Sequence, residues 1–138
     1  MANVFKKLSL YSEMHEDKDK MKLPSAREHF HKLTEKEASA AYEYMDNAIT
    51  IFSFVSPEKD PFGSDDNVGI AILTDGEFVW DALLAFCVKK YRVELPQEFL
   101  DHVARQKAPA NRRTDLDRRE IAKAYFSGKD VQVIGLDS

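Results

Sequence analysis

The sequence has little of what marks secreted or membrane proteins. It contains one cysteine, Cys87, so no intrachain disulfide can form, and the lack of a disulfide framework fits a reducing compartment. Its longest apolar run, 82–88, is far shorter than the roughly 20 residues that cross a bilayer. Its first residues are too polar for a secretory signal. These absences predict a cytoplasmic protein without a membrane-spanning segment.

Motifs for cofactor and metal chemistry are also missing. The five glycines form neither a GxGxxG nor a GxxxxGK[ST] pattern, which excludes the common phosphate-binding loops. His29 and His31 are two positions apart, so on a helix they point to different faces. Cys87 stands alone in an apolar segment, where a buried, inert thiol is expected, and His102 is expected on a polar helix flank. We therefore predict no catalytic residue, no cofactor and no metal site.

The composition predicts one folded domain over residues 1–138. The chain is 43% apolar and has nine Phe, five Tyr and one Trp, enough to form a sizeable core. Twenty basic and 24 acidic residues give a net charge of −4, which disfavours a nucleic-acid partner. Residues 1–69 carry 9 basic and 13 acidic groups, whereas residues 70–138 carry 11 of each. An acidic surface is therefore expected in the first half.

Capping signals and apolar periodicity predict several helices. Capping boxes begin at Ser25, Thr34 and Thr114. The segment 82–91 is apolar nearly all round, ends in basic residues and should be the most buried helix. Pro96 suits the first position of a further helix. The inner faces expected for these helices contain Ala38, Ala41, Tyr42, Met45, Phe99, Leu100, Val103, Ile121, Ala124 and Tyr125.

The strands predict a small sheet. Residues 49–55 are β-branched and aromatic and should form a buried strand, whereas 57–67 should form a loop. Residues 68–74 and 77–80 flank Asp75-Gly76, a pair typical of a two-residue hairpin turn. Trp80 is expected in the core, and 131–134 as an edge strand. We predict an α+β fold, with a small, mainly antiparallel sheet built on this hairpin and packed against several helices.

The hairpin and the helices after it carry a spaced set of residues: Thr74-Asp-Gly-Glu-Phe-Val-Trp80, Tyr91, Leu95-Pro96, Phe99 and His102. This set resembles a pattern of small bacterial proteins, some of which look like immunity partners in toxin–immunity pairs. The resemblance covers Thr74 to His102, about a fifth of the chain. The pattern usually has tryptophan at the position of Phe78 and proline at that of Asp81. The resemblance implies the same fold, because the matched residues are a turn, core aromatics and a helix start.

Together with the acidic, motif-poor composition, the resemblance favours a non-catalytic immunity-type protein that neutralises a toxin by occlusion. The aromatic and aliphatic residues between Val68 and Val103 are expected to close the interior, so activity should lie on the outer surface. A basic toxin domain is the expected partner. If the toxin is a nuclease, the carboxylates of the 57–67 segment would stand in for phosphate. These carboxylates are Glu58, Asp60, Asp65 and Asp66.

Two alternatives remain open. A nucleic-acid accessory protein would use the basic stretch with Arg112, Arg113, Arg118 and Arg119, although interleaved acidic residues favour an exposed helix with internal ion pairs. A small hydrolase would assemble its site from distant segments. That reading requires a pocket in which His29 or His102 meets carboxylates.

Overall fold

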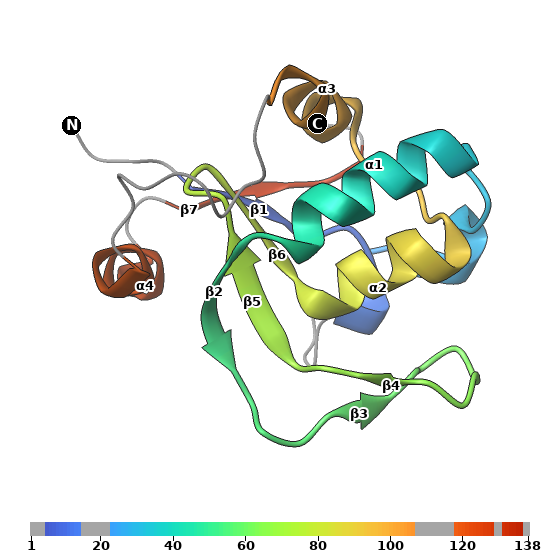
Figure 1. Cartoon of the computed structure of the whole chain (residues 1–138), viewed down its shortest axis with the longest axis horizontal. Coiled ribbons are helices and arrows are strands. Elements are labelled where there is room, and N and C mark those ends of the chain that lie inside the picture. The colour runs from blue at the N-terminus through green and yellow to red at the C-terminus, as the bar shows by residue number, and fades with distance from the viewer. Residues whose placement is uncertain (1–4, 15–22, 107–117, 129–130, 137–138) are drawn as a thin grey trace.

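The computed structural model describes residues 5–14, 23–106, 118–128 and 131–136 (Figure 1). Along the chain the elements are β1 (Phe5–Leu8), the 3₁₀ helices η1 (Ser12–Met14) and η3 (Ala26–His29), α1 (Glu35–Asp46), β2 (Ile49–Ser53), β3 (Glu58–Lys59), β4 (Asn67–Val68), β5 (Ala71–Thr74), β6 (Phe78–Asp81), α2 (Ala82–Tyr91), α3 (Gln97–Arg105), α4 (Arg118–Ser127) and β7 (Val131–Ile134). None of the helices in these ranges has the length and apolarity needed to cross a membrane.

The fold is α+β, as predicted. Five strands form a sheet in the order β2-β5-β6-β1-β7, and β3 pairs with β4 in a separate small sheet. The pairs β2–β5, β5–β6 and β3–β4 are antiparallel, whereas β1 is parallel to both β6 and β7. The predicted hairpin is therefore present, but it supplies only part of a mixed sheet.

Strand β1 is not predicted from the sequence. Its four residues, FKKL, show no strict alternation of apolar and polar side chains. Phe5 and Leu8 are both buried, and they contribute to different clusters on the two faces of the sheet. Lys6 and Lys7 stand between them and obscure the signal. The strand is specified by its two neighbours, which are distant in the sequence.

Helices cover both faces of the sheet. On one face, Leu73 and Trp80 lie opposite each other and pack against α1, α2 and α3; Trp80 is fully buried, as predicted. On the other face, Phe5 and Val79 pack with residues of α4. Figure 1 shows α4 on the opposite side of the sheet from α1 and α2. The larger core thus lies between the sheet and the first three helices.

The β5–β6 turn lies one residue later than predicted. Asp75 N–H donates to the Phe78 carbonyl, so these two residues face each other and Gly76 and Glu77 form the tip. Gly76 has φ +97°, a conformation that glycine adopts without a steric penalty. Asp75 is the last paired residue before the tip, and its side chain accepts hydrogen bonds from the Glu77 and Phe78 amides of the turn.

The helix predictions are largely confirmed. The Thr34 capping box is formed in both directions, and α2 spans 82–91. Ser25 caps only a four-residue 3₁₀ helix, because Glu13, not Glu28, binds both its hydroxyl and the Ala26 amide. Pro96 is the N-cap of α3 and not its first residue. The capping box at Thr114 lies outside the described residues.

Two strand predictions need correction. β2 is not a buried strand: it occupies an edge of the sheet, and beyond a bulge at Thr50–Phe52 its side chains become exposed. The predicted loop 57–67 contains most of a two-stranded hairpin, β3–β4. We call residues 58–68 the arm. It extends below the main sheet in Figure 1.

Candidate functional site

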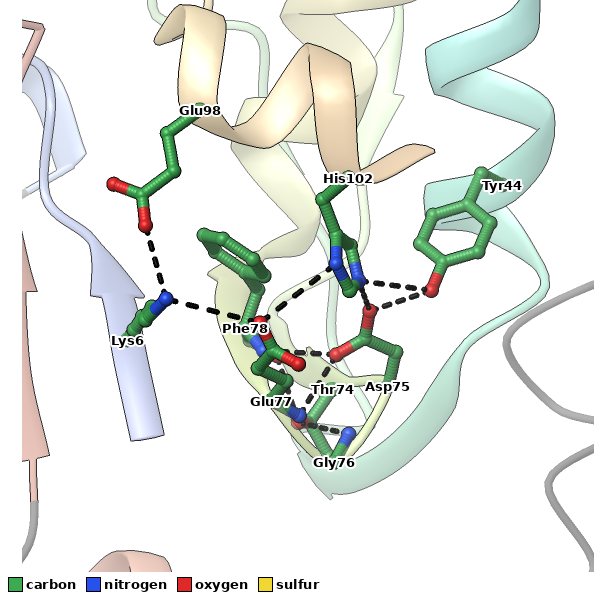
Figure 2. Close-up of polar contacts among 9 residues, drawn as sticks. All are labelled: Lys6, Tyr44, Thr74, Asp75, Gly76, Glu77, Phe78, Glu98 and His102. Atoms are coloured by element: carbon green, nitrogen blue, oxygen red, sulfur yellow. Dashed lines mark hydrogen bonds and ion pairs between the residues drawn. The ribbon is translucent and has the colours of Figure 1, made fainter. Parts of the chain in front are cut away.

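The most elaborate polar cluster joins the hairpin to two helices (Figure 2). The Asp75 carboxylate is fully buried, and its Oδ2 lies 2.5 Å from the Tyr44 hydroxyl of α1 and 2.7 Å from Nε2 of His102 on α3. Its Oδ1 accepts hydrogen bonds from the Glu77 and Phe78 amides at 2.9 and 2.8 Å. One carboxylate therefore organises the turn and anchors both helices.

These contacts define the protonation of the cluster. Burial alone would raise the pKa of Asp75, but hydrogen bonds from His102, Tyr44 and the two amides outweigh it and hold the pKa below its ordinary value. An ionised carboxylate only accepts hydrogen bonds, so Nε2 of His102 must be the donor in this contact. Tyr44 and His102 both direct protons to the same oxygen, which explains the 3.4 Å between the hydroxyl and Nε2.

The cluster continues towards the surface through charged residues. Nδ1 of His102 lies 3.7 Å from Oε2 of Glu77, and Lys6 lies between Glu77 and Glu98 at 3.7 and 2.9 Å. Figure 2 shows this chain of contacts running from α1 to strand β1. The network connects α1, α3, the β5–β6 hairpin and β1, which are far apart in the sequence, and it holds them together.

The placement of His102 corrects its sequence assignment. It is 5% exposed and packs beside Phe78, with ring centroids 4.7 Å apart; it is not on a polar helix flank. The Phe99 face of α3 is buried with it, whereas Leu100 and Val103 are only half-buried. His29 also meets a carboxylate, since its Nδ1 is 2.8 Å from Oε1 of Glu94.

Neither His29 nor His102 lines any of three surface hollows that the described residues form. The first, of about 260 Å³, is bounded by Phe52, Ile70, Ile72, Leu83 and part of the arm. The second, of about 650 Å³, lies between α1, α2 and the other side of the arm. The arm therefore separates two hollows.

The four predicted carboxylates of the arm have different environments. Asp60 is 5% exposed and is held by the Phe62 amide at 2.9 Å, the Ser64 hydroxyl at 2.5 Å and the Tyr91 hydroxyl. Burial would raise its pKa, but these hydrogen bonds lower it below the ordinary value. Asp60 thus fixes the loop of the arm to α2 and does not present its charge to solvent.

The other three carboxylates are exposed. Asp66 forms an ion pair with Lys90 at 2.5 Å and borders the second hollow, whereas Glu58 borders the first. Asp65 lies in the loop between Asp60 and Asp66, both of which are held by contacts with α2. Three of the four predicted contact residues are therefore exposed on the arm, beside two different hollows, whereas the fourth, Asp60, is buried and supports its loop.

The chain matches no protein-family model, no curated protein and no solved structure. The immunity-type function suggested by the resemblance is therefore a hypothesis, and its support comes from the geometry of the chain itself.

A surface aromatic cluster was not anticipated. Phe54 is 60% exposed, Val55 is fully exposed, and Phe126 of α4 is 56% exposed. The Phe52 ring lies 4.9 Å from that of Phe54 and 6.1 Å from that of Phe126, measured between centroids. Residues 49–55 are as apolar as those of a buried strand. The sequence alone therefore does not show that β2 lies at the edge of the sheet, where some of these side chains are exposed.

The remaining candidates have less support from the described residues. Arg118 and Arg119 are exposed at the start of α4, while Arg112 and Arg113 lie outside the described residues. No group of three metal-ligating side chains occurs within the described ranges. Cys87 is fully buried, and burial raises the pKa of its thiol to about 12.

Proposed function

We propose that the protein acts in the cytoplasm by binding another protein, as an immunity-type inhibitor that occludes a toxin domain through the arm. The observation that carries the proposal is that three exposed carboxylates, Glu58, Asp65 and Asp66, lie on one projecting hairpin that borders two hollows. A basic surface would meet negative charge at the arm and could place side chains in the hollows beside it.

The support of the arm favours binding. Asp60 anchors the loop through three hydrogen bonds, and Arg27 donates to the Pro61 carbonyl at 3.3 Å while its guanidinium lies 5.2 Å from the centre of the Phe62 ring. A loop fixed before the encounter loses less conformational entropy on binding. The carboxylates are therefore presented in a preformed arrangement.

Electrostatic attraction should govern the rate of association. Opposite charges at the rim of an interface raise the association rate and make it sensitive to salt. Asp66 is already paired with Lys90, so a basic partner must compete for it, whereas no ion pair is seen for Glu58 or Asp65 in the described structure. These two residues should provide most of the salt-sensitive attraction.

The test takes as partner a basic toxin domain sought among the genes adjacent to this one, and it reverses Glu58 and Asp65 to lysine. We expect association at low salt to slow by about tenfold or more, with little salt dependence remaining. The matched control reverses Glu43 and Asp101, which are exposed on α1 and α3 and change the net charge equally. Equal effects of both double variants would point to net charge alone. Unchanged binding by the first would remove the arm from the interface.

A further inference from the structure

The first hollow, between the arm and the sheet, has an apolar floor. Its half-buried lining residues include Ile70, Ile72, Leu83 of α2 and Met14 of η1. Phe52 of β2 adds an aromatic ring and is 37% exposed. Burying methylene groups against such a surface is favourable in proportion to the apolar area removed from water. The floor therefore favours an occupant with a hydrocarbon stem.

The size of the hollow limits what can occupy it. Pockets that enclose drug-sized ligands measure about 300–1,000 Å³. This hollow measures about 260 Å³, which suits one long side chain of a partner better than a whole small molecule. The second hollow is larger, about 650 Å³, but its lining charges are balanced, with Asp46 and Asp66 against Lys89 and Lys90. The first hollow is therefore the more selective of the two.

The charged side chains around the first hollow are mostly acidic. Glu13, Glu58 and Asp81 line it, and Lys59 is the one basic residue among its lining residues. Burial would raise the pKa of Glu13, but hydrogen bonds from a backbone amide and a hydroxyl at the start of η3 outweigh it and lower the pKa. Glu13 is therefore ionised at neutral pH, and the hollow favours a cation.

Two of these carboxylates already have basic neighbours. Lys7 attracts Asp81, and Arg27 attracts Glu13, although neither basic residue lines the hollow. Glu58 is exposed on the arm, and no ion pair is seen for it in the described structure. The charge of Glu58 is therefore the most available to a cation that enters the hollow.

The arm already holds one arginine of this chain on an aromatic ring. Arg27 donates to the Pro61 carbonyl at 3.3 Å, and its guanidinium lies 5.2 Å from the centre of the Phe62 ring. A guanidinium is weakly hydrated, stacks on aromatic rings and binds carboxylates with two parallel N–H groups. In the hollow, Phe52 offers the ring and Glu58 the carboxylate. Arginine therefore fits better than lysine, whose ammonium is compact and strongly hydrated.

We propose that this hollow receives an arginine side chain of the basic toxin domain. Its methylene groups lie against Ile70 and Ile72, its guanidinium packs on Phe52, and its N–H groups donate to Glu58. The inference rests on the proposed function and adds the kind of residue that the partner inserts. Arginine is enriched among the few interface residues that carry most of the binding energy. The hollow thereby becomes the anchor point beside the charged arm.

Binding of propylguanidinium to the chain alone tests the hollow without the toxin. A ligand of this size should bind with a Kd of about 10 mM, and the methyl NMR signals of Ile70 and Ile72 should shift to saturation. Neutral propylurea has nearly the same shape and should bind about tenfold more weakly. A titration without saturation, or equal binding of propylurea, would overturn the proposal. Tighter binding of butylammonium would overturn the choice of arginine over lysine.

Matched variants locate the probe. Glu58→Gln should weaken propylguanidinium binding, whereas Asp65→Asn removes the same charge from the arm without touching the hollow and should not. Ile70→Trp should fill the hollow and abolish binding. Its control is Phe86→Trp, because Phe86 is half-buried and lines the second hollow but not the first. Equal weakening by Glu58→Gln and Asp65→Asn would contradict the site, and this pair decides even if Ile70→Trp does not fold.

Kinetics with the toxin separate this inference from the proposed function. Ile70→Trp should speed dissociation about tenfold or more at every salt concentration, because it removes an anchor. Reversal of Glu58 and Asp65 should mainly slow association. Unchanged dissociation of Ile70→Trp, together with slowed association of the charge reversal, would overturn this inference alone. A wild-type chain that binds propylguanidinium but no toxin would overturn the proposed function and, with it, the identity of the partner.

Discussion

Nε2 of His102 lies 2.7 Å from Oδ2 of Asp75, although the two residues are 27 positions apart and both are buried. The same oxygen accepts the Tyr44 hydroxyl. The contact joins α3 and α1 to the tip of the β5–β6 hairpin. Asp75, which lies beside the turn, thereby holds the hairpin, α1 and α3 together.

Replacing Asp75 by Asn should destabilise the fold strongly. The amide keeps the size of the carboxylate, but its NH₂ group would face the Tyr44 hydroxyl and His102, both of which now donate to Oδ2. An unsatisfied or opposed buried donor costs about 1–3 kcal/mol, and more when a charge is involved. Urea unfolding should show a loss of about 2–4 kcal/mol with an unchanged m value. Asp65→Asn, on the exposed arm, should change stability by less than about 0.5 kcal/mol.

The free energy of unfolding should fall in acid. Asp75, Asp60 and Glu13 all have pKa values lowered in the folded state, because hydrogen bonds outweigh their burial. The unfolded chain therefore binds more protons. The stability from these groups is present above the ordinary carboxyl pKa and is lost as the pH falls below it through the lowered pKa values of the folded state. In Asp75→Asn the acid limb of a urea-midpoint profile should be shallower; an identical limb would exclude Asp75 from this linkage.

The Cys87 thiol should report unfolding. It is fully buried with its pKa raised to about 12, so the reactive thiolate is scarce in the folded state. Labelling by a thiol reagent at pH 8 should be slow in buffer and fast in denaturant. Stability should also decline as the pH rises from about 9 towards 12, because only the unfolded thiol ionises there. Rapid labelling of the native protein would show that this part of the core opens locally.

Arg92 should be replaceable by glycine with a gain in stability. It ends α2 in the left-handed conformation, with φ 50° and ψ 48°, which is unfavourable for residues with a Cβ. Glycine removes this penalty but has more freedom when unfolded, so a net gain of about 0.5–1 kcal/mol is expected. Lys89→Gly in the same helix should instead lose about 1 kcal/mol. Both values can be read from thermal or urea unfolding.

Local signals in the sequence were sufficient for the elements that depend on nearby residues. The Thr34 capping box, the hairpin and α2 were predicted because their bonds and apolar faces lie within a few positions of each other. Strand β1 could not be found in this way, since its partners β6 and β7 are far along the chain. Its two lysines also disrupt the alternation on which strand prediction depends.

In the candidate sites too, features set by neighbouring residues could be predicted from the sequence, whereas contacts with distant residues could not. The sequence identified the acidic arm, because charge and turn residues are visible locally, but it could not separate buried Asp60 from its exposed neighbours. That difference depends on Tyr91, 31 positions away. Likewise, nothing near His102 signals its contact with Asp75. The exposed phenylalanines of β2 looked like core residues because hydrophobicity does not indicate whether a strand lies at the centre or the edge.

The central place of β1 has a consequence for how the chain reaches its native state during synthesis. Its four residues leave the ribosome before either neighbour exists, because β6 and β7 both follow much later in the chain. Neither side of β1 can be paired early, and contacts this distant in sequence form slowly. A nascent chain paused before residue 131 would leave β1 as an unpaired edge of the unfinished sheet. Closure of the sheet therefore has to wait for the synthesis of β7.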